Sequence, residues 1–106
     1  MSDMSSVSNA FQIFMKEAPE YQKIWMETVQ KLDSVSKLDS KTEELAYISV
    51  LASVRLEGGL PFHVKHAKAL GATREEIISA ILVGLPAVGN IVIQSLPIAI
   101  SAYDSK

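Results

Sequence analysis

The sequence predicts one all-α domain, and three observations support that prediction. Apolar residues recur at spacings of three and four along most of the 106 residues, which is the period of an amphipathic helix. Glycine and proline fall mainly between the periodic segments or at their starts. No segment shows the convincing alternation of a half-buried strand. We therefore expect a single domain over residues 1–106, built of about six helices, without a linker or an internal repeat.

The first two helices are expected in the N-terminal third, after a polar segment. Residues 1–8 are rich in serine and have the composition of a disordered tail. A short first helix is predicted over about 9–16, and Pro19 suits the first turn of the second helix. The apolar stripe of the second helix consists of Tyr21, Trp25, Val29 and Leu32. Trp25 is accordingly predicted to anchor the core.

The third helix has a recognisable start and stop. Ser40 and Glu43 have the spacing of a capping box, so a helix should begin there. It should continue to about Glu57, where Gly58 and Gly59 end it.

Two further helices follow the glycine pair. Proline and glycine bound a fourth helix over 61–71. Thr73 and Glu76 form a second capping box, which should start the fifth helix. Gly84 and Pro86 then end or kink it.

The C-terminal part carries an unusually long uncharged stretch. No charged residue occurs between Glu76 and Asp104, a span long enough to cross a bilayer. Glycines and prolines interrupt it, so we expect no membrane helix, and the sixth helix is placed at about 89–103 with Pro97 at a bend or in its first turn. A domain this small has little interior. Such apolar helices are therefore expected to cover each other across the interfaces of an obligate homo-oligomer.

Composition excludes several classes of function. Ten basic and twelve acidic residues give a net charge of -2, and no basic run exists that would follow a nucleic-acid backbone. The absence of cysteine excludes disulfides, thiolate nucleophiles, cysteine-ligated zinc and redox-active CxxC pairs. The first residues lack the pattern of a secretory signal, so a cytoplasmic protein is expected.

Two charged residues stand out on the third helix, which is apolar nearly all round. Glu44 and Arg55 are eleven positions apart, so they share one helical stripe at a separation of about 16 Å along the axis. Both side chains could line one elongated pocket. Alternatively, each sits near a helix end and complements the helix dipole there.

Two histidines begin the next helix. His63 and His66 are three positions apart and share a face, and the glycine break should bring them close to Arg55 and Glu57. An imidazole beside a carboxylate is suited to general acid–base catalysis near neutral pH. A metal site would need a further ligand such as Glu44, and two histidines without a longer motif are a weak signal. No metal and no cofactor are predicted.

Three motifs follow one another from the third helix to the fifth. They are Leu38-Asp-Ser-Lys-Thr-Glu-Glu-Leu45, His63 and Gly71-Ala-Thr-Arg-Glu-Glu-Ile77. In these motifs, over about the last two-thirds of the chain, the sequence resembles the carboxymuconolactone decarboxylase family, which includes the alkylhydroperoxidase D-like proteins. The resemblance implies a small helical domain assembled as a homotrimer or homohexamer. It places the family's helix glutamate at Glu44 and its histidine at His63.

The sequence also departs from the family's patterns. Leu56 and Gly59 occupy the positions of the CxxC pair in the peroxidase branch, so we do not expect thiol peroxidase activity. The decarboxylase branch has an acid-Leu-x-x-His pattern, of which Leu60 and His63 match the second half while Gly59 replaces the acid. Ala87-Val-Gly-Asn-Ile91 retains only the middle of a Tyr-Ala-Gly-x-Pro segment.

These residues support an enzyme, a binding protein or a structural protein. As an enzyme, the chain would be a thiol-free, cofactor-free lyase or isomerase acting on a small carboxylated lactone or related acid. Arg55 would hold a substrate carboxylate, His63 would donate or accept a proton on carbon, and Glu44 would orient its imidazole, with His66 and Glu57 as further substrate-binding residues. The alternatives are a ligand-binding protein without turnover, or a buried polar network at an oligomer interface.

Overall fold

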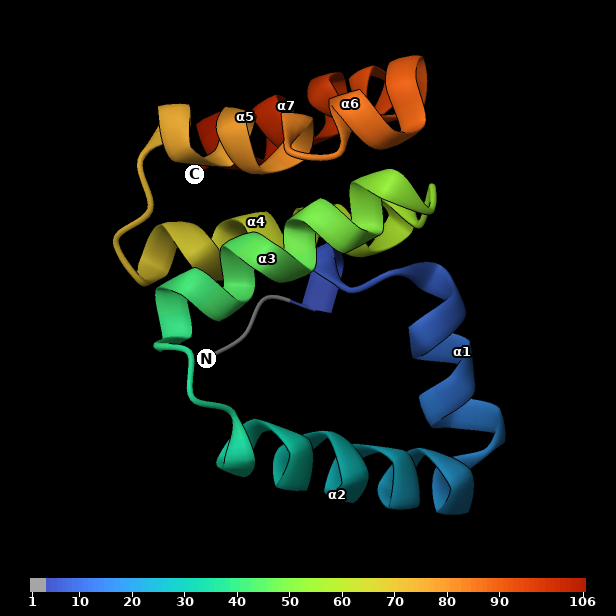
Figure 1. Ribbon diagram of the computed structural model, residues 1–106. Helices are drawn as coiled ribbons and strands as arrows, with labels where there is room; N and C mark the ends of the chain where they lie inside the picture. Colours follow the sequence, from blue (N-terminus) through green and yellow to red (C-terminus); the bar gives the residue numbers. More distant parts are fainter. Residues whose placement is uncertain (1–3) are drawn as a thin grey trace.

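The computed structural model describes residues 4–106 and contains helices joined by short turns (Figure 1). The elements are η1 (Met4–Ser6), α1 (Asn9–Glu17), α2 (Pro19–Val35), α3 (Ser40–Ser53), η2 (Glu57–Gly59), α4 (Leu60–Ala69), α5 (Arg74–Leu82), α6 (Leu85–Val88), η3 (Gly89–Ser95) and α7 (Leu96–Asp104), where η marks a 3₁₀ helix. The predicted all-helical class is confirmed. The number of helices differs from the six expected, because the C-terminal part is divided more finely.

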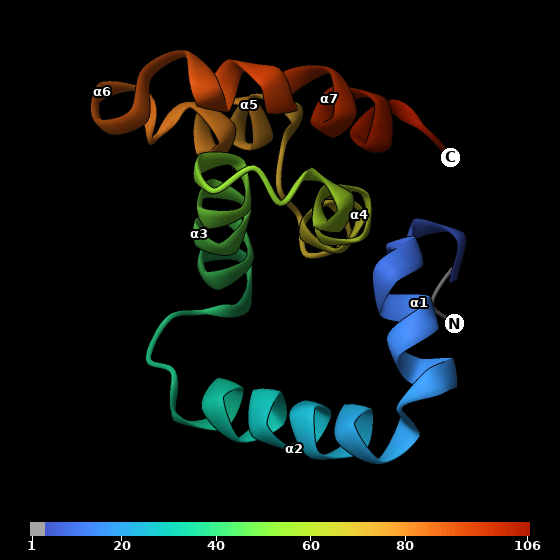
Figure 2. The ribbon, with the colours of Figure 1, turned by 90° about the vertical axis from the view of Figure 1, so that its right-hand side faces the viewer.

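Four helices form the core in two layers. α3 and α4 run antiparallel in one layer, and α5 and α7 form the other layer packed on them (Figures 1 and 2). The apolar side chains buried between the layers include Ile48, Leu51, Leu60, Val64, Ile77, Ile81 and Val92. This packing fixes the relative position of α3 and α4, which carry the residues of the candidate site.

The reversal between α3 and α4 differs from its prediction. α3 ends at Ser53, earlier than Glu57, and Arg55 adopts the left-handed conformation with φ of 63°. The glycine pair forms the 3₁₀ helix η2, and neither glycine has a positive φ. A Cβ on Gly59 would lie 3.3 Å from Leu51 Cδ1, so close packing on α3 is what this glycine permits. Arg55, and not the glycine pair, therefore has the positive φ of this reversal.

The two capping predictions had different outcomes. α3 is capped by Asp39, whose Oδ1 accepts a hydrogen bond from the Thr42 amide at 2.9 Å. The predicted cap, Ser40, is instead the first helical residue, because the preceding carboxylate is a better-placed acceptor. The capping box of Thr73 and Glu76 at the start of α5 is confirmed, with reciprocal bonds of 3.1 and 2.9 Å.

The uncharged C-terminal stretch folds back on itself. The predicted helix over 89–103 is divided into η3 and α7, and Pro97 lies in the first turn of α7. Gly89, with a φ of 65°, lies further back in the chain, where α6 ends and η3 begins. Arg74–Asp104 is long and apolar enough to span a membrane by length and composition, with a mean hydropathy of 2.0 in its most apolar window. In the structure its parts α5 and α7 pack against each other over α3 and α4 (Figure 1).

The N-terminal helices form an arm set apart from the core. α1 and α2 contact each other, and α2 lies away from the two layers in both views (Figures 1 and 2). Neither helix contains a buried residue, and Trp25 is 53% exposed. The prediction that Trp25 anchors the core is wrong for the single chain. The apolar stripe exists, but it lies on a helix that the rest of the chain does not cover.

The segment before α1 is only partly described. Residues 1–3 of the predicted tail lie outside the described residues. Met4–Ser6 form η1, in which Ser6 is buried. Ser8 caps α1 by accepting a hydrogen bond from the Phe11 amide at 3.2 Å. From Met4 onward, the segment is therefore structured where a tail was expected.

Candidate active site

One carboxylate joins two imidazoles between α3 and α4. Glu44 is buried on α3, and its Oε1 lies 2.8 Å from His63 Nδ1. Its other oxygen, Oε2, contacts His66 Nδ1. The contact between Glu44 and His63, which the role expected of Glu44 requires, is thus made within one chain. Glu44 does not merely complement the dipole of α3.

The helix period of α4 explains how both histidines reach the same acid. Leu60, Val64 and Ala67 repeat at helical spacing and are buried in the core. His63 and His66 lie beside this stripe, one turn apart, on the side that faces α3. The antiparallel packing of the two helices therefore brings both rings to Glu44.

The protonation state of the cluster follows from its surroundings. Burial by itself raises the pKa of the Glu44 carboxyl, but the hydrogen bonds and charges of His63 and His66 outweigh burial and hold that pKa below its ordinary value of 4.5. Glu44 is therefore ionised at neutral pH and can only accept hydrogen bonds. Each imidazole must then donate its Nδ1–H, which leaves both Nε2 atoms for other partners.

Aromatic side chains flank the imidazoles. The Tyr47 ring centroid is 4.5 Å from that of His63, and Phe62 lies 5.2 Å from His63 and 6.2 Å from His66. The side chains of His63 and His66 are 27% and 50% exposed. In a single chain the cluster is thus open to solvent at an aromatic rim. Sequence reasoning missed this rim, although Tyr47 is one turn from Glu44 and Phe62 adjoins His63.

The structure does not bring Arg55 and Glu57 into this cluster. Arg55 lies beyond the C-terminal end of α3 and forms an ion pair with Glu57. Within residues 4–106, neither makes a hydrogen bond or ion pair with His63 or His66. The expectation that all five residues meet is therefore wrong for the single chain. The cause is the early end of α3, which lets Arg55 turn toward its own loop.

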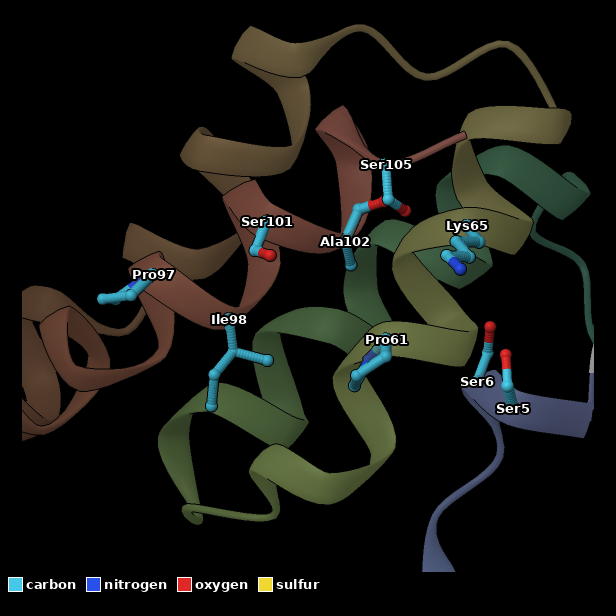
Figure 3. A pocket seen from close by; sticks show the side chains of 9 residues that line it. All are labelled: Ser5, Ser6, Pro61, Lys65, Pro97, Ile98, Ser101, Ala102 and Ser105. Carbon is cyan, nitrogen blue, oxygen red and sulfur yellow. The ribbon is translucent and has the colours of Figure 1, made fainter.

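A separate groove lies on another side of α4. It has a volume of about 440 Å³ and is bounded by η1, α4 and α7 (Figure 3). Its lining consists of Ser5, Ser6, Pro61, Lys65, Pro97, Ile98, Ser101, Ala102 and Ser105. None of the predicted site residues contributes to it, and no sequence motif marks it.

The described residues contain no ready-made metal site. Over residues 4–106, no group of three or more His, Asp or Glu side chains has an arrangement that could hold a metal ion. At the Glu44 cluster, both carboxylate oxygens are engaged by imidazole Nδ1 atoms. The arrangement is instead that of two imidazoles oriented by a shared carboxylate.

Comparisons with known proteins agree with this fold. The sequence profile of the carboxymuconolactone decarboxylase family matches residues 19–100, most of the chain. A crystal structure of the apo form of a carboxymuconolactone decarboxylase family protein from Legionella pneumophila has a TM-score of 0.77 and 24% sequence identity, covering 95% of this chain and 94% of that chain. A search of curated proteins found no match. At this identity the structural similarity shows the fold alone.

Proposed function

Because the chain belongs to the carboxymuconolactone decarboxylase family, we propose that it is a thiol-free, cofactor-free lyase or isomerase acting on a small carboxylated lactone or related acid. The observation that carries this proposal is the bond of 2.8 Å between Glu44 and His63 Nδ1. This bond fixes the ring at Nδ1, so that Nε2 is the nitrogen left to meet a substrate. An imidazole held in this way is a general base or acid near neutral pH.

The reaction needs a proton transfer at carbon. When a substrate carboxylate leaves as carbon dioxide, its bonding electron pair passes into the conjugated lactone as a dienolate, and His63 Nε2–H would then give a proton to carbon. When a C–H bond next to the lactone carbonyl is broken instead, neutral His63 Nε2 would take the proton. The aromatic rim of Tyr47 and Phe62 would hold the apolar ring of such a substrate. These roles use only atoms that the cluster exposes.

Binding of the substrate carboxylate requires a cation. Arg55 is paired with Glu57 at the far end of α3, so it would serve this role only if a second chain brought it to the cluster. A homotrimer or homohexamer, the assembly proposed from the family resemblance, would provide such a neighbour. It would also cover the exposed apolar residues of α2 and of the C-terminal layer, such as Trp25, Val83 and Ile91.

One observation favours a non-catalytic alternative. Glu44, His63 and His66 satisfy one another's hydrogen bonds, which is also expected of a structural polar network or of a binding site without turnover. The cellular location proposed with either function is cytoplasmic, with neither nucleic acid nor membrane as partner. The net charge of -2 supports the exclusion of nucleic acid.

The test uses the purified protein and two defined lactone acids. 4-Carboxymuconolactone reports decarboxylation, and muconolactone reports isomerisation, both by ultraviolet absorbance. Wild-type turnover should show a bell-shaped pH profile, and His63→Gln should lower it by about 100-fold or more. Lys16→Gln on α1 is the matched surface control and should be unchanged.

The alternatives have distinct outcomes in the same experiment. Native mass spectrometry reports the number of subunits and any retained small molecule. A protein that retains an organic acid but turns over neither probe would be a binding protein. Loss of assembly in His63→Ala, without ligand or turnover in the wild type, would establish the structural role.

A further inference from the structure

The Glu44 cluster contains one more imidazole than a single oriented base requires. Each oxygen of one carboxylate contacts the Nδ1 of a different histidine. The two histidines lie one turn apart on α4, so their rings are neighbours. His66 therefore has the same partner and the same orientation constraint as His63.

The shared acid fixes what each ring presents outward. An ionised carboxylate accepts at both oxygens and donates at neither, so both Nδ1 atoms carry hydrogen. Each Nε2 then carries a lone pair that can accept a proton when its ring is neutral, and an N–H group that can donate one when its ring is charged. With one ring charged and the other neutral, the cluster offers an acid and a base side by side.

On the basis of the proposed function, we propose that His66 is a second catalytic residue. The site would perform a 1,3-proton shift on an unsaturated γ-lactone, with His63 as the base and His66 as the acid. Such a shift breaks a C–H bond next to the carbonyl and forms one two carbons away. Two neighbouring proton-transfer groups on one face of the substrate suit this geometry.

The step balances within the cluster. Neutral His63 Nε2 takes the proton from the carbon next to the carbonyl, and the electron pair moves into a dienolate. His66 Nε2–H then protonates the γ carbon, and the double bond becomes conjugated with the carbonyl. His63 ends charged and His66 neutral, so the net charge is unchanged. Proton exchange with water restores the starting state, because the His66 side chain is half exposed.

The arrangement itself has a test that needs no turnover. Nitrogen-15 NMR distinguishes Nδ1–H from Nε2–H imidazole tautomers, and in wild-type protein both neutral rings should be Nδ1–H. In Glu44→Gln, the amide offers one acceptor and one donor group, so one ring should switch to Nε2–H. An Nε2–H tautomer at His66 in the wild type would overturn the proposal, and this readout does not depend on the variant folding.

The catalytic test uses α-angelica lactone, a β,γ-unsaturated lactone without a carboxylate, whose conjugated product absorbs in the ultraviolet. His63→Gln and His66→Gln should each lower the isomerisation rate by about 100-fold or more. Lys65→Gln, on the same helix but facing the groove of Figure 3, is the matched control and should stay within about twofold. In heavy water the product should carry one deuterium at the γ carbon.

The contrary outcomes separate this inference from the proposed function. A wild-type rate in His66→Gln would show that His66 is not catalytic. Transfer of the substrate's own hydrogen to the γ carbon would show that one residue moves the proton alone. Either result would overturn the inference. Wild-type protein that decarboxylates 4-carboxymuconolactone but does not isomerise α-angelica lactone would overturn the inference and leave the proposed function standing. Inactivity on every lactone would overturn both.

Discussion

At the residue scale, the two imidazole partners of Glu44 stabilise its negative charge. Burial opposes its charge, yet His63 and His66 hold the pKa of Glu44 below the ordinary value of 4.5. A carboxyl whose folded pKa is lowered stabilises the fold above its unfolded pKa. It loses that contribution as the pH falls through the folded value. The stabilisation by Glu44 is therefore present at neutral pH and declines below about pH 4.5.

The first prediction concerns Glu44→Gln. At neutral pH the variant should lose about 2 kcal/mol of unfolding free energy, because a neutral amide makes neither hydrogen bond charge-assisted and can accept from only one of the two rings. On acidification below pH 4.5 the difference from wild type should shrink, since only the wild type has this carboxylate to protonate. Urea unfolding between pH 3 and pH 7 measures both. A difference that stays constant across that range would contradict the assigned role of the charge.

Arg55 is a second residue with a testable constraint. Its φ of 63° is unfavourable for any side chain that carries a Cβ. Arg55→Gly should therefore leave the unfolding free energy unchanged or raise it by up to about 1 kcal/mol, whereas Arg55→Val should lower it. Chemical denaturation of both variants makes the comparison. Equal destabilisation would mean that side-chain contacts, and not the backbone, decide this position.

The same glycine variant tests the proposed role of Arg55 in binding. If Arg55 of a neighbouring chain holds the substrate carboxylate, Arg55→Gly should raise KM for a lactone acid. It should leave kcat for α-angelica lactone unchanged, because that probe has no carboxylate. An unchanged KM for the acid would remove Arg55 from the site.

At the scale of elements, Gly84 permits the close approach of the α5–α6 turn to α3. A Cβ at this position would lie 2.5 Å from Ser53 Oγ. Gly84→Ala should therefore destabilise the fold by about 1–3 kcal/mol. Ser53→Ala in the same chain should restore part of the loss, because it removes the clashing oxygen.

Thermal or urea unfolding of Gly84→Ala, of Ser53→Ala and of the double variant measures the coupling between the two positions. Gly58→Ala is the matched control, since its nearest neighbour, Ser8 Cβ, would be at an ordinary contact distance of 3.6 Å. If Gly84→Ala were as mild as that control, the packing of the turn on α3 would be looser than the structure shows.

At the scale of the whole molecule, the exposed arm predicts assembly. α2 has no buried residue, and its apolar side chains are at the surface of the single chain. An isolated helix of this length is marginal in water, so we expect a second chain to cover it. Light scattering should show a stable oligomer at micromolar concentration, and a monomer there would contradict this prediction.

The only tryptophan reports on the same surface. Trp25 is 53% exposed in one chain, so its fluorescence should be blue-shifted in the assembly and shift to the red on dissociation. Trp25→Glu should dissociate the oligomer. Gln30→Glu adds the same charge on the same helix, about 140° away from Trp25, and should leave the oligomer intact. Equal effects of the two variants would argue for charge repulsion rather than for a contact at Trp25.

The sequence by itself determined the features that depend on neighbours along the chain or on residue type. The helical class, the capping box of Thr73 and Glu76, the place of Pro97 in a first turn and the absence of thiol chemistry all follow from local hydrogen bonding or from composition. The spacing of α4 also indicated that His63 and His66 share a face. These interactions involve residues within four positions of one another, and such patterns are visible in a sequence.

Only the tertiary structure decided how distant segments meet. It placed both histidines on one carboxylate, paired Arg55 with Glu57, and left the stripe of Trp25 on an uncovered arm. None of these follows from periodicity, because a helix period gives the face of a side chain but not the partner that packs on it. The end of α3 is the clearest case. The chain reverses at Arg55, which adopts the left-handed conformation, and not at the predicted glycine pair. Gly59 of η2 packs closely on Leu51, and this contact between separate segments is not visible in local sequence preference.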